Sequence, residues 1–167
     1  MGKRALVAYG SKSGATGEIA AEIGAVLSRS GFDVNVRRAR NVRGVEDYDL
    51  VVLGSAVYMG RWLREARRLL NRPELVGRDV WLFSSGPVGE QAQSGESEKW
   101  TKPARITRRG EHIGAHEHVV FGGSVSEQGG GFLRRNMAKS IDPAFRDLRD
   151  WDEIADWALK IVTAHVD

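Results

Sequence analysis

The sequence predicts an α/β fold, a doubly wound five-stranded parallel sheet with helices on both of its faces. Short apolar runs alternate along the chain with longer amphipathic stretches, which is the pattern of parallel strands joined by helices. One run, Leu50-Val51-Val52-Leu53-Gly54, is continuously apolar, as is typical of a central strand buried on both faces. The 167 residues contain no internal repeat and no domain boundary, so a single domain over 1–167 is predicted.

Each element follows from the spacing of its apolar residues. Residues 4–9 form the first predicted strand, and the helix over 14–29 places Ile19, Ile23 and Leu27 on one side before Gly31 ends it. Alternating apolar residues over 32–38 indicate an edge strand. The remaining predicted elements are strands at 50–54, 80–83 and 119–123 and amphipathic helices at 61–71 and 151–166. Trp62 is assigned to the apolar side of the 61–71 helix.

The loop after the first strand carries three hydroxyls beside the start of a helix. The first amides of a helix have no intrahelical partner and lie at the positive end of its dipole. Together with the hydroxyls of this loop they predict a phosphate cradle, in which Gly14 allows close approach of the backbone. The alternative is an ordinary turn that is capped by Ser13 or Thr16. The residues of the predicted cradle are Ser11, Lys12, Ser13, Gly14, Ala15 and Thr16.

Two common phosphate-binding motifs do not fit this loop. A P-loop needs Gly-Lys-Ser or Gly-Lys-Thr, which follows no predicted strand here. The dinucleotide fingerprint G-x-G-x-x-G needs a glycine where Lys12 stands. A terminal monophosphate held by hydroxyls is therefore favoured over a pyrophosphate.

Two further loops, 54–61 and 84–90, are expected to meet the 10–16 loop at the carboxyl ends of the strands. Ligands of such sheets bind there, at the switch point between the first and third strands. The ring of Tyr58 can stack on another flat ring or pack over the sheet edge, and the 84–90 loop is rich in backbone amides. The residues expected to hold a flat heterocycle are Ser55, Ala56, Val57, Tyr58, Met59, Gly60, Ser85, Gly86, Pro87, Val88 and Gly89.

The 10–16 loop closely resembles the phosphate-binding loop of the flavodoxin family, which holds the phosphate of FMN. The chain is similar to this family and, within it, to the menaquinone-dependent protoporphyrinogen oxidase branch, through 9–20, 52–63, 119–125 and 150–161. The resemblance implies the flavodoxin-like strand order 2-1-3-4-5, FMN as cofactor, and a role as oxidoreductase or electron-transfer protein. The alternative that it implies is a protoporphyrinogen oxidase that passes electrons to a quinone.

The sequence assigns no catalytic side chain, since no acid–base pair is forced near these loops. FMN itself supplies the redox chemistry, while the protein binds and shields it. An electron carrier and an enzyme that transfers hydride to an outside acceptor are both compatible with this pattern. A binding module that keeps the fold without FMN is the non-redox alternative.

Composition limits the chemistry further. The chain has no cysteine, which excludes disulfides, thiolate catalysis and thiolate-bound iron–sulfur clusters. Residues 1–4 lead into a strand too short for a signal peptide or a membrane span, so a soluble, cytoplasmic protein is expected. His112, His116 and His118 with Glu111 and Glu117 suggest a metal site, but exposed histidines before a strand are commoner, and no metal is predicted.

A basic run over 99–109 suggests a partner. It holds Lys99, Lys102, Arg105, Arg108 and Arg109, although the formal net charge of the chain is only +3. A solvated helix or loop face is the commoner explanation of such a run. No RNA- or DNA-reading motif accompanies it, so nucleic acid is not expected. An acidic redox protein, a small-molecule or quinone acceptor, and peripheral contact with an anionic membrane surface fit it equally well.

Overall fold

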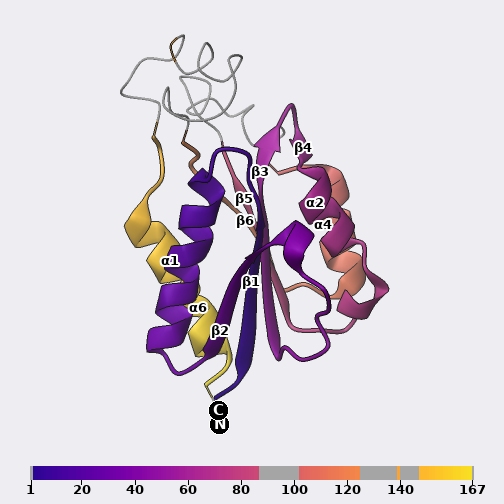
Figure 1. Ribbon diagram of the computed structural model, residues 1–167, viewed down its shortest axis with the longest axis vertical. Coiled ribbons are helices and arrows are strands. Elements are labelled where there is room, and N and C mark those ends of the chain that lie inside the picture. Colours follow the sequence, from indigo (N-terminus) through magenta and orange to yellow (C-terminus); the bar gives the residue numbers. More distant parts are fainter. Residues whose placement is uncertain (1, 87–101, 125–138, 140–146, 167) are drawn as a thin grey trace.

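The computed structural model describes residues 2–86, 102–124, 139 and 147–166. A central sheet separates two layers of helices (Figure 1). Helices α1 (Ala15–Arg29) and α6 (Trp151–Ala164) cover one face of the sheet, and α2 (Arg64–Leu70) and α4 (Ala104–Ile113) cover the other. This three-layer arrangement confirms the predicted α/β fold.

The parallel strands are β1 (Arg4–Gly10), β2 (Asp33–Arg38), β3 (Leu50–Tyr58), β5 (Val80–Ser85) and β6 (His118–Phe121). They pair in the order β2-β1-β3-β5-β6. Because β5 and β6 are the fourth and fifth parallel strands in sequence, this is the predicted order 2-1-3-4-5. A short strand β4 (Arg61–Trp62) pairs antiparallel with the end of β3.

Two apolar cores lie on the two faces of the sheet. On one side, α1 and α6 pack Ile19, Ile23 and Ile161 against Val7 and Val52, all of them fully buried. On the other side, α2 packs Ala66, Leu69 and Leu70 against Leu6 and Leu53. Leu6 and Val7 enter different cores because successive side chains of a strand point to opposite faces of the sheet. A central strand that is buried on both faces therefore has a continuous apolar sequence.

The strand and the helix predicted around residues 50–71 have different bounds in the structure. The strand expected to end at Gly54 continues through Tyr58, and the helix expected from Arg61 begins at Arg64. Trp62, assigned from the sequence to the apolar side of that helix, lies in β4 and is 2% exposed. The stretch after Arg38 forms a 3-10 helix, η1 (Ala39–Asn41), and a second one, η2 (Pro73–Leu75), precedes β5.

Helix α4 was not identified as an element from the sequence, which showed only a basic run. The arginines Arg105 and Arg108 lie on its exposed side, whereas Ile106 and Ile113 enter the core under it. Gly110 faces Leu82, and there is little room for a Cβ at this point. Lys99 lies outside the described residues. Among the described helices, none is long and apolar enough to cross a bilayer.

Candidate functional site

The carboxyl ends of three strands lie side by side at one pole of the sheet. Gly10 at the end of β1 is in register with Ser55 of β3, which is in register with Ser84 of β5. Figure 1 shows that α1 begins at this pole, while the two chain ends lie at the opposite one. This pole is the switch point of the sheet, because β1 and β3 are neighbours there and the helices that follow them lie on opposite faces.

The 11–16 loop is held in place by buried hydrogen bonds. Ser11 is 2% exposed, and its hydroxyl accepts a hydrogen bond of 2.9 Å from the Gly14 amide. The carboxylate of Glu65 on α2 accepts from the Ser11 amide at 3.3 Å and from Arg38 at 2.9 Å. A positive φ of 92° at Gly14 turns the chain into α1. No side chain caps this helix, so the alternative of a cap by Ser13 or Thr16 is wrong.

The remaining donors of the loop fit a phosphate. Ser13 is exposed and Thr16 is buried at the start of α1. Within the part of the chain that the structure describes, neither hydroxyl has a hydrogen-bond partner. The amides in the first turn of α1, which begins at Ala15, have no carbonyl within the helix to which they can donate. Two hydroxyls, several amides and the exposed Lys12 thus offer donors and positive charge to an anion at one helix start.

The predicted ring-binding residues between 55 and 60 lie on a β-hairpin rather than in a loop. Ser55 and Ala56 are buried inside β3, and the Ser55 hydroxyl accepts from the Leu63 amide at 3.0 Å. Val57 and Tyr58 pair with Trp62 and Arg61 of β4. Met59 and Gly60 form the tip, with φ of 50° and 72°. The hairpin presents Tyr58 and the 91%-exposed Met59 beside the strand ends.

Lys12 connects the two predicted halves of the site. Its ammonium nitrogen lies 4.9 Å from the centroid of the Tyr58 ring, in a cation–π contact. The structure therefore brings the phosphate loop and the aromatic residue of the hairpin together. The Lys12 ammonium thus lies over one face of the Tyr58 ring. A phosphate group bound at the 11–16 loop would attract the same ammonium.

The third predicted segment is only partly described. Ser85 is 5% exposed at the end of β5, and the Gly86 amide donates to the carbonyl of Phe121 at 3.0 Å. Gly86 has a φ of 143°, where glycine is favoured. Pro87, Val88 and Gly89 lie outside the described residues, so their predicted contact with the ring stays a prediction.

A buried polar chain runs beneath the hairpin and was not anticipated from the sequence. The indole nitrogen of Trp62 donates to the Ser84 hydroxyl at 2.8 Å. That hydroxyl lies 2.7 Å from Nε2 of His118, whose Nδ1 lies 3.2 Å from the Thr107 hydroxyl. A serine proton directed to Nε2, with the imidazole proton on Nδ1, is one arrangement that satisfies all three contacts.

The histidines were expected to be exposed, and for His118 this is wrong. Burial, with a smaller contribution from the charge of Lys102, lowers the pKa of His118 to about 4. His116 is exposed, and its ring stacks on that of Trp81 with 4.5 Å between the ring centroids. Its Nε2 lies 2.9 Å from Oδ1 of Asp79. Among the described residues, no group of three or more His, Asp or Glu side chains is arranged to hold a metal ion.

Comparison with known protein families identifies the chain. A model described as "Flavodoxin domain" matches residues 6–144. The chain belongs to the flavodoxin-domain family. Flavodoxin domains bind FMN and carry electrons to redox partners. A comparison with curated protein sequences gives no significant match.

Solved flavodoxin structures share the fold of this flavodoxin domain over nearly its whole length. Flavodoxin 2 from Bacillus cereus is 22% identical with a TM-score of 0.64, covering 97% of this chain and 98% of that one. A flavodoxin from the domain Archaea is 15% identical with a TM-score of 0.64, covering 96% and 97%. A flavodoxin from Streptococcus pneumoniae TIGR4 is 17% identical with a TM-score of 0.63, covering 98% and 99%.

Proposed function

We propose that this flavodoxin domain binds FMN at the carboxyl ends of β1, β3 and β5 and transfers electrons between redox partners. The observation that carries the proposal is the start of α1, where Ser13 and Thr16, whose hydroxyls have no partner among the described residues, lie beside the first-turn amides and Lys12. This donor set suits a terminal phosphate. FMN supplies one- and two-electron chemistry when it is bound.

The residues of the chain have distinct roles in this proposal. Ser13, Thr16 and the first-turn amides of α1 would hold the phosphate, and Ser11 would keep the loop in shape through Gly14. Tyr58 would contact the ring from the hairpin, with Ser85, Gly86 and the 87–89 segment on its other side. Glu65 supports the loop from behind, because it accepts from the Ser11 amide and is paired with Arg38.

The physiological partner is part of the proposal. The exposed side of α4, with Arg105 and Arg108, favours an acidic redox protein. The narrower alternative from the sequence, oxidation of a porphyrinogen with transfer of electrons to a quinone, is not supported by the comparisons.

The test compares FMN with riboflavin, which lacks only the phosphate. The protein is purified, its bound flavin is released by heating and identified, and the affinities of the apoprotein for both flavins are measured. Ser13→Ala and Thr16→Val remove one hydroxyl each, and Thr16→Val preserves the buried volume. Each is expected to weaken FMN binding by about 1.5–3 kcal/mol, the typical contribution of a hydrogen bond to a charged group, and to leave riboflavin unaffected.

A matched control lies on the same helix. Ser28→Ala removes an exposed hydroxyl at the far end of α1 and should change neither affinity. Equal losses of FMN and riboflavin in the Ser13 and Thr16 variants would overturn the assignment of the phosphate loop. A colourless protein that binds neither flavin would overturn FMN binding as a whole.

A further inference from the structure

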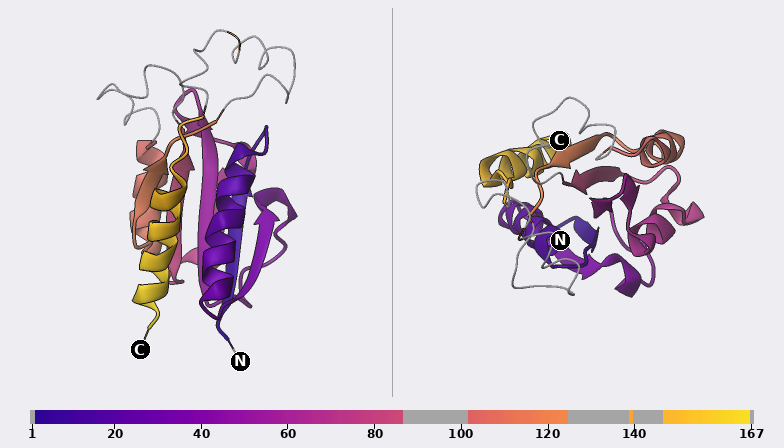
Figure 2. Two further views of the ribbon diagram at one scale, coloured as in Figure 1. Left: turned by 90° about the vertical axis from the view of Figure 1, so that its left-hand side faces the viewer. Right: turned by 90° about the horizontal axis from the view of Figure 1, so that it is seen from above.

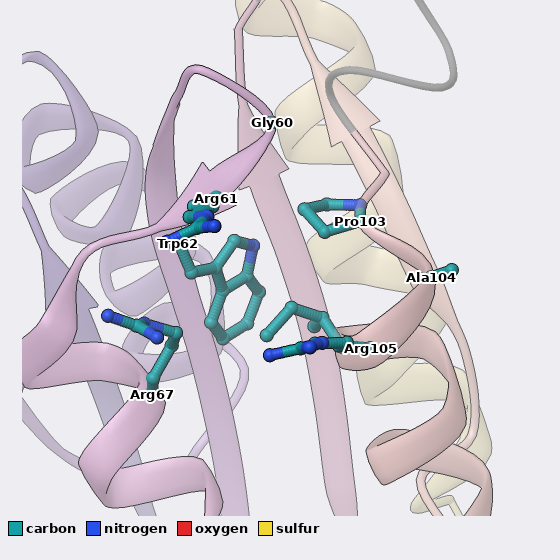
Figure 3. Close-up of a pocket in the computed structure, with 8 residues that line it drawn as sticks. Gly60, Arg61, Trp62, Arg67, Pro103, Ala104 and Arg105 are labelled. Carbon is teal, nitrogen blue, oxygen red and sulfur yellow. The ribbon is translucent and has the colours of Figure 1, made fainter.

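A cavity lies beside the β3–β4 hairpin, and none of its lining residues belongs to the 11–16 loop. It has a volume of about 290 Å³ and lies between the hairpin, α2 and the start of α4. Figure 3 shows the side chain of Trp62 in its middle, with Arg67 of α2 on one side and Arg105 of α4 on the other. The lining residues are Gly60, Arg61, Trp62, Arg67, Pro103, Ala104, Arg105 and Ile106.

Three guanidinium groups converge on this cavity without an acidic partner. Within the described residues, Arg61, Arg67 and Arg105 form no ion pair and no side-chain hydrogen bond. Other half-buried arginines of the chain are engaged: Arg149 pairs with Asp147, and Arg109 donates to the Leu70 carbonyl at 3.1 Å. The cavity is therefore a concentration of positive charge that the described protein leaves uncompensated.

Arg67 shows that the imbalance extends into the interior. Its Nε is buried and has no hydrogen-bond partner. A buried donor left without a partner costs stability, so native proteins pair nearly all of them. Three like charges around one small cavity also repel each other. An anion in the cavity would relieve the repulsion and give the guanidinium groups acceptors.

The walls between the arginines are apolar and held rigidly. Trp62 is fixed by its 2.8 Å hydrogen bond to Ser84, and the exposed fraction of Ile106 is 5%. Pro103 is buried just before the first turn of α4, whose positive dipole end lies at the cavity. A bare inorganic ion would leave this apolar surface unused, whereas a ring or short hydrocarbon body would cover it.

We propose that this cavity binds a small organic anion, with its carboxylate or phosphate group on Arg61, Arg67 and Arg105 and an apolar body against Trp62, Pro103 and Ile106. Guanidinium groups bind carboxylates and phosphates alike through paired N–H donors, so a ligand with either anionic group would be bound by the same interactions. This site is separate from the phosphate loop at the start of α1 and does not depend on FMN binding.

The experiment uses the full chain, with calorimetric titration and thermal unfolding as readouts. The probes are benzoate, phenyl phosphate, inorganic phosphate and the neutral benzamide, each with and without saturating FMN. Benzoate or phenyl phosphate is expected to bind with one site and raise the unfolding temperature, because a ligand that binds the native state stabilises it. Benzamide and inorganic phosphate are expected to bind at least tenfold more weakly than whichever of benzoate and phenyl phosphate binds more tightly.

Variants assign the binding to the cavity. Arg105→Gln, on an exposed side chain, and Arg67→Gln are each expected to weaken the tighter probe at least tenfold. The matched control is Arg108→Gln on the same helix, which should leave the affinity within twofold. Without ligand, Arg67→Gln should unfold at the same temperature as the parent or higher, since a repulsive charge is removed.

Three outcomes would overturn the proposal. The first is that neither benzoate nor phenyl phosphate binds to the parent protein. The second is that Arg108→Gln weakens binding of the tighter probe as much as Arg67→Gln and Arg105→Gln do. Inorganic phosphate that binds as tightly as phenyl phosphate would show that the apolar walls contribute nothing. Competition between FMN and the probes would place the probes at the flavin site and would equally refute a separate cavity.

Discussion

The Ser84 hydroxyl lies 2.7 Å from Nε2 of His118, in the interior between β5 and β6. With Trp62 on one side and Thr107 on the other, this pair links the hairpin to α4 through four side chains. Burial lowers the pKa of His118, so the imidazole is neutral at neutral pH and can accept the serine proton at Nε2. Protonation of this buried histidine at low pH would put a charge into the interior between the hairpin and α4.

The first prediction concerns pH. Burial is the main reason that the pKa of His118 is lowered to about 4 in the folded protein, from the ordinary histidine value of 6.5. Between these values the unfolded chain binds more protons, so stability is complete above about pH 6.5 and is lost as the pH falls towards 4. The unfolding free energy should fall by about 2 kcal/mol between pH 7.5 and pH 5 from this group alone.

Urea unfolding at several pH values measures this change. His118→Gln removes the titrating group while keeping an amide that can bond to Ser84. Its unfolding free energy should depend less steeply on pH than that of the parent. Identical slopes for the two proteins would show that His118 does not control acid stability.

The second prediction concerns Tyr58. Tyr58→Ala removes the predicted ring contact and the partner of Lys12. Stacked aromatic rings gain about 0.5–1.5 kcal/mol beyond their buried area. We expect a roughly tenfold loss of affinity for FMN and riboflavin alike, brighter fluorescence of the bound flavin, and a shifted reduction potential.

Tyr58→Phe keeps the ring and is the control for the hydroxyl. It should retain most of the quenching and affinity. If fluorescence, affinity and potential are all unchanged in Tyr58→Ala, the tyrosine is a packing residue of the hairpin, and the ring contact belongs to another segment.

The third prediction concerns the hairpin tip. Met59 and Gly60 both have positive φ, as the two-residue type I′ turn requires. Gly60 adopts this conformation freely, whereas Met59 is strained in it. Met59→Asn should raise the unfolding free energy by up to about 1 kcal/mol, because asparagine is favoured there.

Met59→Gln is the matched control. It also replaces the 91%-exposed methionine by a polar side chain, but it has no preference for the left-handed region. Urea unfolding should show little gain for Met59→Gln. An equal gain in both variants would attribute the effect to polarity rather than to backbone strain.

The fourth prediction concerns Gly54. A Cβ at this position in β3 would collide with the ring of Phe83 on β5. Phe83 is fully buried and packs on Trp157 at 6.1 Å between ring centroids, so it cannot yield freely. Gly54→Ala should lower the unfolding free energy by about 1–3 kcal/mol, the usual cost of overpacking a core.

Phe83→Leu provides the second half of a double-mutant cycle. It opens space opposite Gly54, so the cost of Gly54→Ala should be smaller in that background. Purely additive effects in the cycle would show that the two residues do not interact.

Hydrophobic periodicity was sufficient to predict the parallel strands of the sheet, and the resemblance to the flavodoxin family supplied their order. Leu6, Val7, Leu53 and Val52 are buried on two faces, and their continuous apolar runs identify β1 and β3 correctly. The β3–β4 hairpin was missed because its tip is Met59-Gly60 rather than Asn-Gly, the usual signal of such a turn. Trp62 then appeared to continue the helical pattern of α2, which begins only at Arg64.

The polar interior was harder to predict. Ser84 and His118 meet because β5 and β6 are neighbouring strands in which Leu82 is in register with His118. No local sequence pattern predicts a contact between residues so far apart in the chain. Helix α4 was hidden by its arginines, since few apolar residues mark its buried side. For the predicted phosphate loop, composition alone was enough to propose the hydroxyls of Ser13 and Thr16, whereas the turn-forming role of Ser11 depends on a 2.9 Å contact with Gly14.

The start of β1 and the end of α6 lie at the pole opposite the strand ends (Figure 2), where the Lys3 ammonium donates to the His165 carbonyl at 3.4 Å. A short peptide joining them would close the chain into a ring without crossing the proposed flavin site. New termini could then be opened at an exposed turn such as Gly77, giving a circular permutant. The same geometry would let the domain be tethered to an electrode or a fused reductase with its redox pole facing outward.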